Sequence, residues 1–378
     1  MILRERLSLV GRAGQETEEK YMRKSYVLAL AGALLLLSPA FSQQKSFKVI
    51  LLCDMEGVSG ATSVRHTNFG ANPEYEEARK SLTADVNAAI AGLKAAGATE
   101  IIVVDGHGSG NTQSPDVLEA ELLAPAKMIS RDRPFDIYMD SYDPSVDAIV
   151  AVAMHAGAGN PAGFISHTYT IEDIQYRVNG TPFNESMILA MGAARFGIPL
   201  IMVSGDDQLE KEIRRFLPWV KYAAGKRAVG RTKAEPFPRE EVSRRIEKAA
   251  REALLALDAA RLPENFPGPF RFALTFQDES QARTVAGLQG AELLSDSVSV
   301  QIRAADFEEG YRASLRLIST AGLVGRLQAA QRVLAAQPNA AALREAVSKS
   351  ITDRWLDPQP APPAPAASAA PQRYWGAR

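Results

Sequence analysis

Cysteine is almost missing from this sequence. The chain has 378 residues and a single cysteine, Cys53, so it cannot form a disulfide within itself. A structural zinc site made of cysteine thiolates is excluded for the same reason. Cys53 lies in an apolar run, and we therefore interpret it as a small core residue rather than as a catalytic thiol.

A strong charge of either sign and internal repeats are missing as well. The formal net charge is -1, and a nearly neutral chain lacks the basic surface that nucleic-acid binding needs. We find no internal repeat and no coiled-coil heptads. Hydrophobic residues make up 46% of the chain, which is typical of a globular protein with a packed core.

Near the N-terminus an apolar stretch covers residues 27–37, which is too short to span a bilayer. Basic residues at 22–24 precede it and a small-x-small cleavage pattern at 40–42 follows it, as in a secretory signal peptide. We expect this signal, residues 22–42, to direct export to the periplasm or the medium, with a mature chain from near Gln43 and no membrane span after cleavage. A retained anchor is the alternative. The polar residues 1–21 suggest that translation starts at Met22.

The apolar, β-branched run at 47–53 predicts a buried parallel strand. Asp54 and Glu56 follow it directly, and Gly57 and Gly60 come next. Open α/β sheets bind their ligands at the carboxyl ends of such strands. Burying two carboxylates there costs free energy unless a cation compensates them. A metal ion is the simplest candidate.

A strand–helix–strand unit begins with this strand. A proline and acidic residues in the first turn, followed by an apolar stripe, predict a helix over residues 73–96. A second buried strand follows at 100–105, and such crossovers join parallel strands. The chain up to residue 217 adds buried strands at 148–154 and 199–203, a hairpin arm at 164–178 turning at Asn179-Gly180, and helices at 183–196 and 209–217.

The composition changes after residue 231. Helices are predicted over 240–257, 307–317 and 323–348, and strands over 270–276 and 298–302. The whole pattern predicts an α/β fold with a mostly parallel central sheet flanked by helices and a smaller α+β C-terminal subdomain. The expected parts are the N-terminal extension with the signal (1–42), the α/β metal-binding catalytic domain (43–233), the α+β subdomain (234–322), a helical extension (323–356) and a disordered Pro/Ala-rich tail (357–378).

Histidine is scarce, and its placement is informative. The four histidines are His66, His107, His155 and His167. His107 and His155 come right after predicted buried strands, on the same sheet edge as Asp54 and Glu56, where parallel strand ends meet. With Glu185 these side chains make five candidate ligands of mixed oxygen and nitrogen type. That set suits zinc, with manganese or cobalt as alternatives, and one carboxylate would bridge if two ions bind.

Each of these residues also has an ordinary structural explanation. A single histidine is more often a hydrogen-bonded residue than a ligand, and Asp54 and Glu56 resemble residues that cap a helix. Glu185 suits the positive end of its helix. Asp206 and Asp207 either cap the next helix or bind substrate. His66 follows no strand and is interpreted as a loop residue. The joint placement at one edge favours the metal site.

The sequence resembles the zinc-dependent D-aminopeptidase family of the DppA type over residues 48–323. Six blocks carry the resemblance in the family's order: CDMEGVSG at 53–60, VVDGHG at 103–108, AMHAG at 153–157, ISHTY at 165–169, NGTPFNES at 179–186 and VSGDD at 203–207. The resemblance implies two zinc ions, with Asp54 as the bridge, Glu56 and His107 on one ion, and His155 and Glu185 on the other. It implies catalysis by His167 and a ring-shaped homo-oligomer. The export signal and the residues beyond 323 depart from the family pattern.

The function implied is hydrolysis of the N-terminal residue of short peptides or amides. The resemblance alone suggests a D-residue there, such as D-alanine. His167 would stabilise the oxyanion or move a proton, and Asp206 or Asp207 would hold the substrate ammonium. One alternative is a dinuclear metal phosphoesterase or amidohydrolase, because the glycines of 106–110 suit a phosphate. The other is an exported peptide- or metal-binding protein without turnover.

Overall fold

The computed structural model describes residues 46–68, 72–107, 115–129, 136–171, 173–264 and 269–357. The predicted extension and signal, residues 1–42, and the tail from 358 onward lie outside these ranges, so their roles stay predictions. Among the described helices, none combines the length and the apolar composition needed to cross a bilayer.

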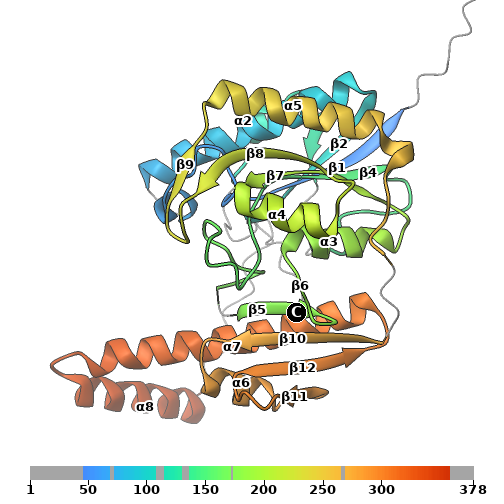
Figure 1. The fold of residues 1–378 in the computed structure, drawn as a ribbon. Coiled ribbons are helices and arrows are strands. Elements are labelled where there is room, and N and C mark those ends of the chain that lie inside the picture. The colour runs from blue at the N-terminus through green and yellow to red at the C-terminus, as the bar shows by residue number, and fades with distance from the viewer. Residues whose placement is uncertain are drawn as a thin grey trace, which may run out of the picture. The chain divides into compact units, whose positions relative to one another are not determined.

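A seven-stranded sheet carries the residues of interest (Figure 1). Its strand order is β3-β2-β1-β4-β7-β8-β9, and every neighbouring pair is parallel except β8 and β9. The strands are β1 (Phe47–Cys53), β2 (Ala98–Asp105), β3 (Ala126–Met128), β4 (Ala148–Met154), β7 (Leu200–Asp206), β8 (Lys221–Ala228) and β9 (Ala234–Pro236). The mostly parallel sheet predicted from the sequence is confirmed.

Helices cover both faces of this sheet, which is why its central strands are apolar throughout. The four helices are α2 (Pro73–Ala95), α3 (Glu185–Ala194), α4 (Asp207–Phe216) and α5 (Arg239–Leu255). In Figure 1, α2 and α5 lie on one face, and α3 and α4 lie on the other. Alternate residues of β1 divide between the two faces: Val49 and Leu51 pack with the first pair of helices, and Ile50 and Leu52 with the second.

The strand order places a switch point at the centre of the sheet. From β1 the chain goes outward to β2 and β3, and it then returns to β4 on the other side of β1 and continues to β7. A crevice forms where consecutive crossovers leave in opposite directions, outside the carboxyl ends of the two central strands. Asp54 follows β1 at this point, and His155 follows β4.

A second, antiparallel sheet has the order β11-β12-β10-β5-β6. Its strands are β5 (Asp173–Val178), β6 (Thr181–Pro182), β10 (Phe270–Phe276), β11 (Ala291–Leu293) and β12 (Ser299–Ala304), with helices α6 (Glu279–Val285) and α7 (Phe307–Ala335) packed against it. Asn179 and Gly180 both have positive φ, 49° and 83°, which confirms the predicted hairpin turn. The strand of this hairpin arm, predicted over 164–178, is shorter in the structure and begins at residue 173.

The two sheets do not divide the chain at residue 234, where we expected the smaller subdomain to begin. β5 and β6 precede this residue but belong to the second sheet. α5 follows it but packs against α2 on the first sheet. The amphipathic pattern of α5 was predicted correctly, but it cannot say which sheet the apolar face covers. Both sheets share one core, in which Ile50 and Phe272 belong to the same cluster of buried residues.

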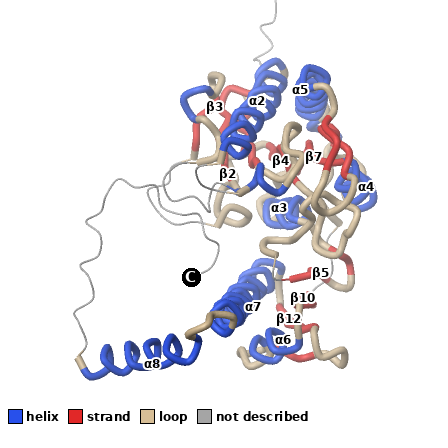
Figure 2. Tube along the Cα trace, turned by 90° about the vertical axis from the view of Figure 1, so that its left-hand side faces the viewer, coloured by secondary structure: helices blue, strands red, loops and turns tan. Residues whose placement is uncertain are grey.

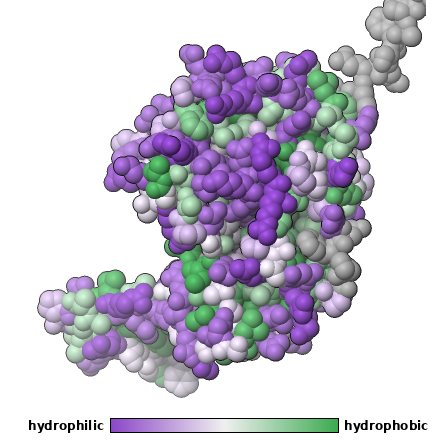
Figure 3. All heavy atoms as spheres, viewed as in Figure 1, coloured by the Kyte–Doolittle hydropathy of each residue, from purple (hydrophilic) through white to green (hydrophobic). Residues whose placement is uncertain are grey.

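The C-terminal helices differ from the prediction in their boundaries. We expected helices over 307–317 and 323–348, but α7 continues without a break to Ala335, and α8 covers Ala340–Leu356. Gly322 lies within α7 and is buried, so this glycine serves close packing rather than helix termination. α8 has no buried residue, and Figure 2 shows it beyond the end of α7, away from both sheets. Figure 3 shows hydrophobic side chains among hydrophilic ones on this part of the surface.

Candidate metal centre

The loop after β1 is held so that Asp54 and Glu56 face the crevice. Gly57 donates its backbone N–H to the carbonyl of Ala153, 2.8 Å away. A Cβ atom at position 57 would lie 2.0 Å from the carbonyl oxygen of Met154, so only glycine allows this approach of the loop to β4. On the other side, Asp85 of α2 accepts hydrogen bonds from the backbone N–H and the hydroxyl of Ser59, both at 2.9 Å.

His107 stands at the end of β2 with its ring orientation fixed. Its Nδ1 hydrogen-bonds to the carboxylate of Asp116, and Nε2 points to Glu56, whose Oε1 lies 3.7 Å away. Asp116 is itself held by Asp105, which accepts from the backbone N–H of Asp116 at 2.5 Å and of Val117 at 3.0 Å. A carboxylate behind a histidine fixes the tautomer and makes the other nitrogen a better metal ligand.

His155, at the end of β4, lies between the carboxylates of two other elements. Its Nε2 is 3.3 Å from Oδ2 of Asp54 and 3.6 Å from Oε1 of Glu185. Its Nδ1 faces the carbonyl of Ala156 at 3.0 Å, so Nδ1 carries the proton in the neutral ring and the Nε2 lone pair faces the two carboxylates. Glu185 opens α3 and is held by the hydroxyl of Tyr138 and by the backbone N–H of Tyr169.

His167 stacks on His155. The ring centroids are 4.0 Å apart and the planes differ by 11°. Nδ1 of His167 faces the carbonyl of Ile165 at 2.8 Å, and Nε2 lies 4.0 Å from Oε1 of Glu185. Imidazole lone pairs lie in the ring plane, and nearly parallel planes do not meet near the rings. One ion therefore cannot be bound by both Nε2 atoms at the 2.0–2.1 Å that zinc requires.

Two buried polar atoms of this cluster, Oε2 of Glu56 and Nε2 of His155, have no hydrogen-bond partner among the described residues. Asp54, Glu56 and Glu185 are also buried, at 5%, 6% and 4% exposure. Unpaired polar atoms in such a place cost free energy in a folded protein. A cation bound between these side chains would remove that cost.

The carboxylates and imidazoles perturb each other strongly. Burial and the nearby charge of Glu56 raise the pKa of Asp54 to about 8. Burial also raises the pKa of Glu185, but His155 lowers it more, to about 2. Burial and the charge of His155 lower the pKa of His167 below its usual value. Without a cation, ionisation of Asp54 beside the other two carboxylates is unfavourable near neutral pH, whereas a divalent ion would favour it.

The cluster has the ligands and the spacing of a metal site. Two overlapping groups offer ligand atoms within 4.8 Å of one another: Asp54, Glu56 and His155, and His155, His167 and Glu185. His107 joins the first group through its 3.7 Å approach to Glu56. The oxygen and nitrogen donors suit zinc, and Asp54 and His155 lie in the middle of the arrangement. The five predicted ligands therefore converge, and the residues present fit a metal.

Lys226 is a buried residue that sequence reasoning missed. It lies on β8 with no exposure, and its ammonium donates to the carbonyl oxygens of Glu56, Val58 and Ala61. The ring of Phe164 lies 4.4 Å from Nζ. All three protons of the ammonium are therefore used to hold the loop that carries Glu56. Burial lowers the pKa of Lys226 to about 7.

We expect the replacement Lys226→Met to lower zinc affinity at least tenfold, because three buried carbonyl groups lose their donor and the loop relaxes. The free energy of unfolding should also fall, by about 2–5 kcal/mol. Zinc titration and thermal unfolding, compared with Lys221→Met on the exposed side of the same strand, measure both. Unchanged zinc affinity in a folded Lys226→Met protein would mean that Glu56 does not depend on this clamp.

The other predicted residues have structural roles. Asp206 is the N-cap of α4, accepting from the backbone N–H groups of Gln208 at 2.9 Å and Leu209 at 2.8 Å, and its second oxygen accepts from Phe164 at 3.0 Å. Of the two alternatives for Asp206, the structure shows the capping one. Asp207 accepts from the backbone N–H of Ala228 at 2.8 Å. His66 lies in a short 3-10 helix and bonds to Ser63.

Backbone strain collects around the cluster. Three non-glycine residues near it have left-handed φ values: Ala153 at 62°, Ile165 at 48° and Tyr169 at 71°. Such conformations cost about 1–3 kcal/mol each and tend to occur at functional sites. Ala153 immediately precedes the last residue of β4, and the other two lie two residues before and after His167.

Comparison with known proteins agrees with this geometry. A family model described as D-aminopeptidase, peptidase family M55, matches residues 47–315. The D-aminopeptidase of Bacillus subtilis strain 168 is 28% identical over 269 residues, which is 71% of this chain and 95% of that protein.

Among solved structures, the chain is similar to one described as the Zn-dependent D-aminopeptidase DppA from Bacillus subtilis, a self-compartmentalizing protease. The TM-score is 0.66 at 26% identity, over 73% of this chain and 98% of the other. Asp54, Glu56, His107, His155, His167 and Glu185 all lie within the residues matched by the family model. The match ends before the exposed part of α7 and before α8. This chain belongs to the D-aminopeptidase family of metal-dependent peptidases.

Proposed function

We propose that this protein is a zinc-dependent D-aminopeptidase that binds two zinc ions and removes the N-terminal residue from short peptides. The observation that carries the proposal is the convergence of four buried ligand-type side chains, Asp54, Glu56, His155 and Glu185, and the partly buried His107 at the switch point of a sheet. The similar Bacillus structure is described as Zn-dependent, which supports zinc over manganese or cobalt.

The residues divide into ligands and groups that act on substrate. Asp54, Glu56, His107, His155 and Glu185 would hold the metal. Bound zinc supplies Lewis acidity and a water whose pKa lies near ~7. Burial and the charge of His155 lower the pKa of His167 and favour its neutral form. Its Nδ1 is engaged by the carbonyl of Ile165, and its Nε2 lies 4.0 Å from Oε1 of Glu185. Nε2 of His167 would therefore accept a proton and deliver it to the leaving amine.

The N-terminal ammonium of a substrate would lie near the carboxylates of the metal centre. Asp206 and Asp207, which we first considered for that role, are engaged in capping and backbone contacts, so Glu56 or Glu185 is the better placed anion. Peptides that begin with D-alanine, released when cell walls are remodelled, suit an exported enzyme of this kind. The proposal includes export and assembly into a closed oligomer, as suggested by the self-compartmentalizing Bacillus structure.

One experiment tests the proposal. Metal content of the purified protein is measured together with the hydrolysis of matched D- and L-alanyl peptides and amides. We expect two zinc ions per chain and faster turnover of the D-peptides, with activity lost on chelation and restored by zinc. Hydrolysis of p-nitrophenyl phosphate in place of peptides would show a phosphoesterase, and tight peptide binding without turnover would show a binding protein.

A further inference from the structure

A cavity of about 500 Å³ lies beside His167. Its wall is partly apolar, with Ile165, Ile171 and Ile174, and partly polar, with Ser166, Thr232 and Gln277. Cavities of roughly 300–1,000 Å³ are the usual size for small-molecule sites. Because His167 contributes to the wall, a molecule in this cavity would lie next to the metal centre.

Among the described residues that line the cavity, Arg231 is the one arginine or lysine, and none is a carboxylate. Within the described part of the chain, the Arg231 side chain has no ion pair and no hydrogen bond, whereas Arg227 on the same hairpin is paired with Glu235. A cation without a protein partner in a concave site is suited to an anionic group of a ligand. Guanidinium binds carboxylates well because its N–H groups form a planar fork.

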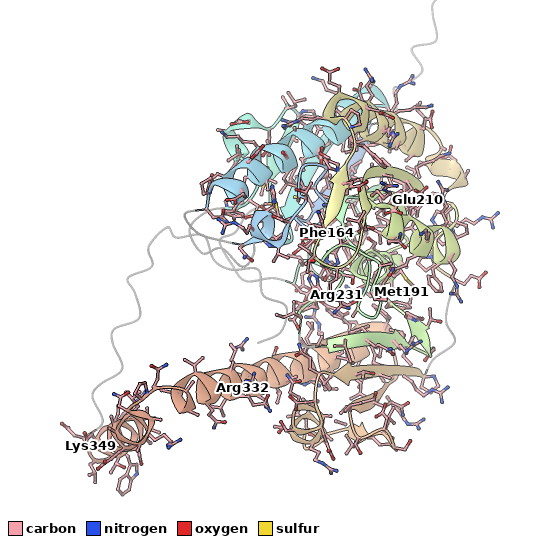
Figure 4. All side chains as sticks on the ribbon, turned by 60° about the vertical axis from the view of Figure 1, so that its left-hand side comes forward. Phe164, Met191, Glu210, Arg231, Arg332 and Lys349 are labelled. Atoms are coloured by element: carbon pink, nitrogen blue, oxygen red, sulfur yellow. The ribbon has the colours of Figure 1, made fainter. Side chains whose placement is uncertain are left out.

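The backbone of Arg231 is fixed relative to His167. Arg231 lies in the turn between β8 and β9, and its carbonyl accepts a hydrogen bond from Ile165 at 2.8 Å. Two residues later the same turn pairs with Ser63, after β1. Figure 4 shows Arg231 near Phe164, the residue that precedes Ile165. The guanidinium is thus carried by a segment bonded to the one that presents His167.

The proposed reaction places the N-terminal end of the peptide at the metal centre. The cavity beside His167 offers a cation, Arg231, which attracts an anionic group of the same substrate. We propose that Arg231 binds the C-terminal carboxylate of the substrate and makes the enzyme selective for short peptides with a free carboxylate. This inference rests on the proposed function, and it adds the class of substrate.

The test uses two substrates that differ only in their terminal charge, D-alanyl-D-alanine and D-alanyl-D-alaninamide. We expect the zinc-loaded enzyme to prefer the free acid by tenfold or more in kcat/KM, mostly through KM. The Arg231→Gln variant should lose this preference. Its KM for the free acid should rise roughly tenfold or more, while its KM for the amide should stay unchanged. Arg231→Lys should retain part of it. Lys233→Gln removes a charge from the same turn outside the cavity and should retain all of it.

Equal kcat/KM for acid and amide in the unmodified enzyme, or equal effects of Arg231→Gln on both, would overturn the role of Arg231. If neither peptide is hydrolysed, the proposed aminopeptidase function fails instead. In that case calorimetry with the same two peptides still measures the preference for the carboxylate, and equal affinities for the two would overturn the inference about Arg231.

Discussion

Asp54→Ala protein is expected to retain less than one zinc ion per chain and to have no measurable peptidase activity. Asp54 lies 3.3 Å from Nε2 of His155 and in one ligand group with Glu56, so it is the residue placed to contact both halves of the centre. Removing it would delete a shared ligand and leave Glu185 as the one carboxylate beside Nε2 of His155. Metal analysis after dialysis, together with turnover of a D-alanyl peptide, measures the effect.

Two variants control this experiment. Asp54→Asn keeps the shape and an acceptor for the N–H of Met55, which lies 2.8 Å from Oδ1, so it separates loss of charge from loss of folding. Asp143→Ala removes an exposed carboxylate far along the chain and should leave metal content and activity unchanged. Full zinc stoichiometry in Asp54→Ala would refute the shared-ligand role.

His167→Ala is expected to keep its zinc and to lose about 10²- to 10⁴-fold in kcat, the range associated with a general acid or base. The stacking of His167 on His155 prevents the two from binding one ion, and its low pKa leaves Nε2 free to accept a proton. Zinc analysis and steady-state kinetics of the same preparation separate a catalytic role from a ligand role.

His66→Ala is the matched control, because His66 is the one histidine outside the cluster. It should leave both kcat and zinc content unchanged. If His167→Ala instead loses one zinc ion per chain, His167 is a ligand with Glu185. If it turns over peptide at the original rate, His167 has no part in the reaction.

The ligands could be predicted because parallel topology concentrates strand ends at one edge. Asp54, His107 and His155 each follow a strand directly, and apolar runs reveal where such strands end. Glu185 was added as a fifth candidate ligand, and the resemblance then assigned it to one of the two ions. The geometry among these residues, and the stacking of the rings, needed the structure.

The supporting residues could not be predicted, because their partners are backbone atoms or are distant in sequence. Lys226 sits in KYAAGKRA, a strand that looks half-exposed by composition, and its three acceptors are carbonyl oxygens that no side-chain pattern reveals. Asp116 bonds to His107 directly and is held by Asp105, in a segment without periodicity. A lysine in a strand between small residues, near a cluster of predicted ligands, is the one signal that would have pointed to Lys226.

The second sheet shows a similar limit. β5 pairs with β10, which places Val178 beside Phe272, and hydrophobic alternation alone does not specify a partner so far along the chain. The predicted helix boundaries were wrong around residue 322, because α7 continues through the buried Gly322 to Ala335. α8 buries nothing, and its exposed Val347, Ile351 and Trp355 have no explanation in the structure.

The central claim is that Asp54, Glu56, His107, His155 and Glu185 together hold zinc at the carboxyl edge of the first sheet. Anomalous diffraction at the zinc absorption edge, on crystals grown with zinc, tests it most directly. The account predicts two peaks within bonding distance of these five side chains, with Asp54 contacting both. Zinc found elsewhere on the molecule, with the imidazoles of His107 and His155 not bound to it, would contradict the account.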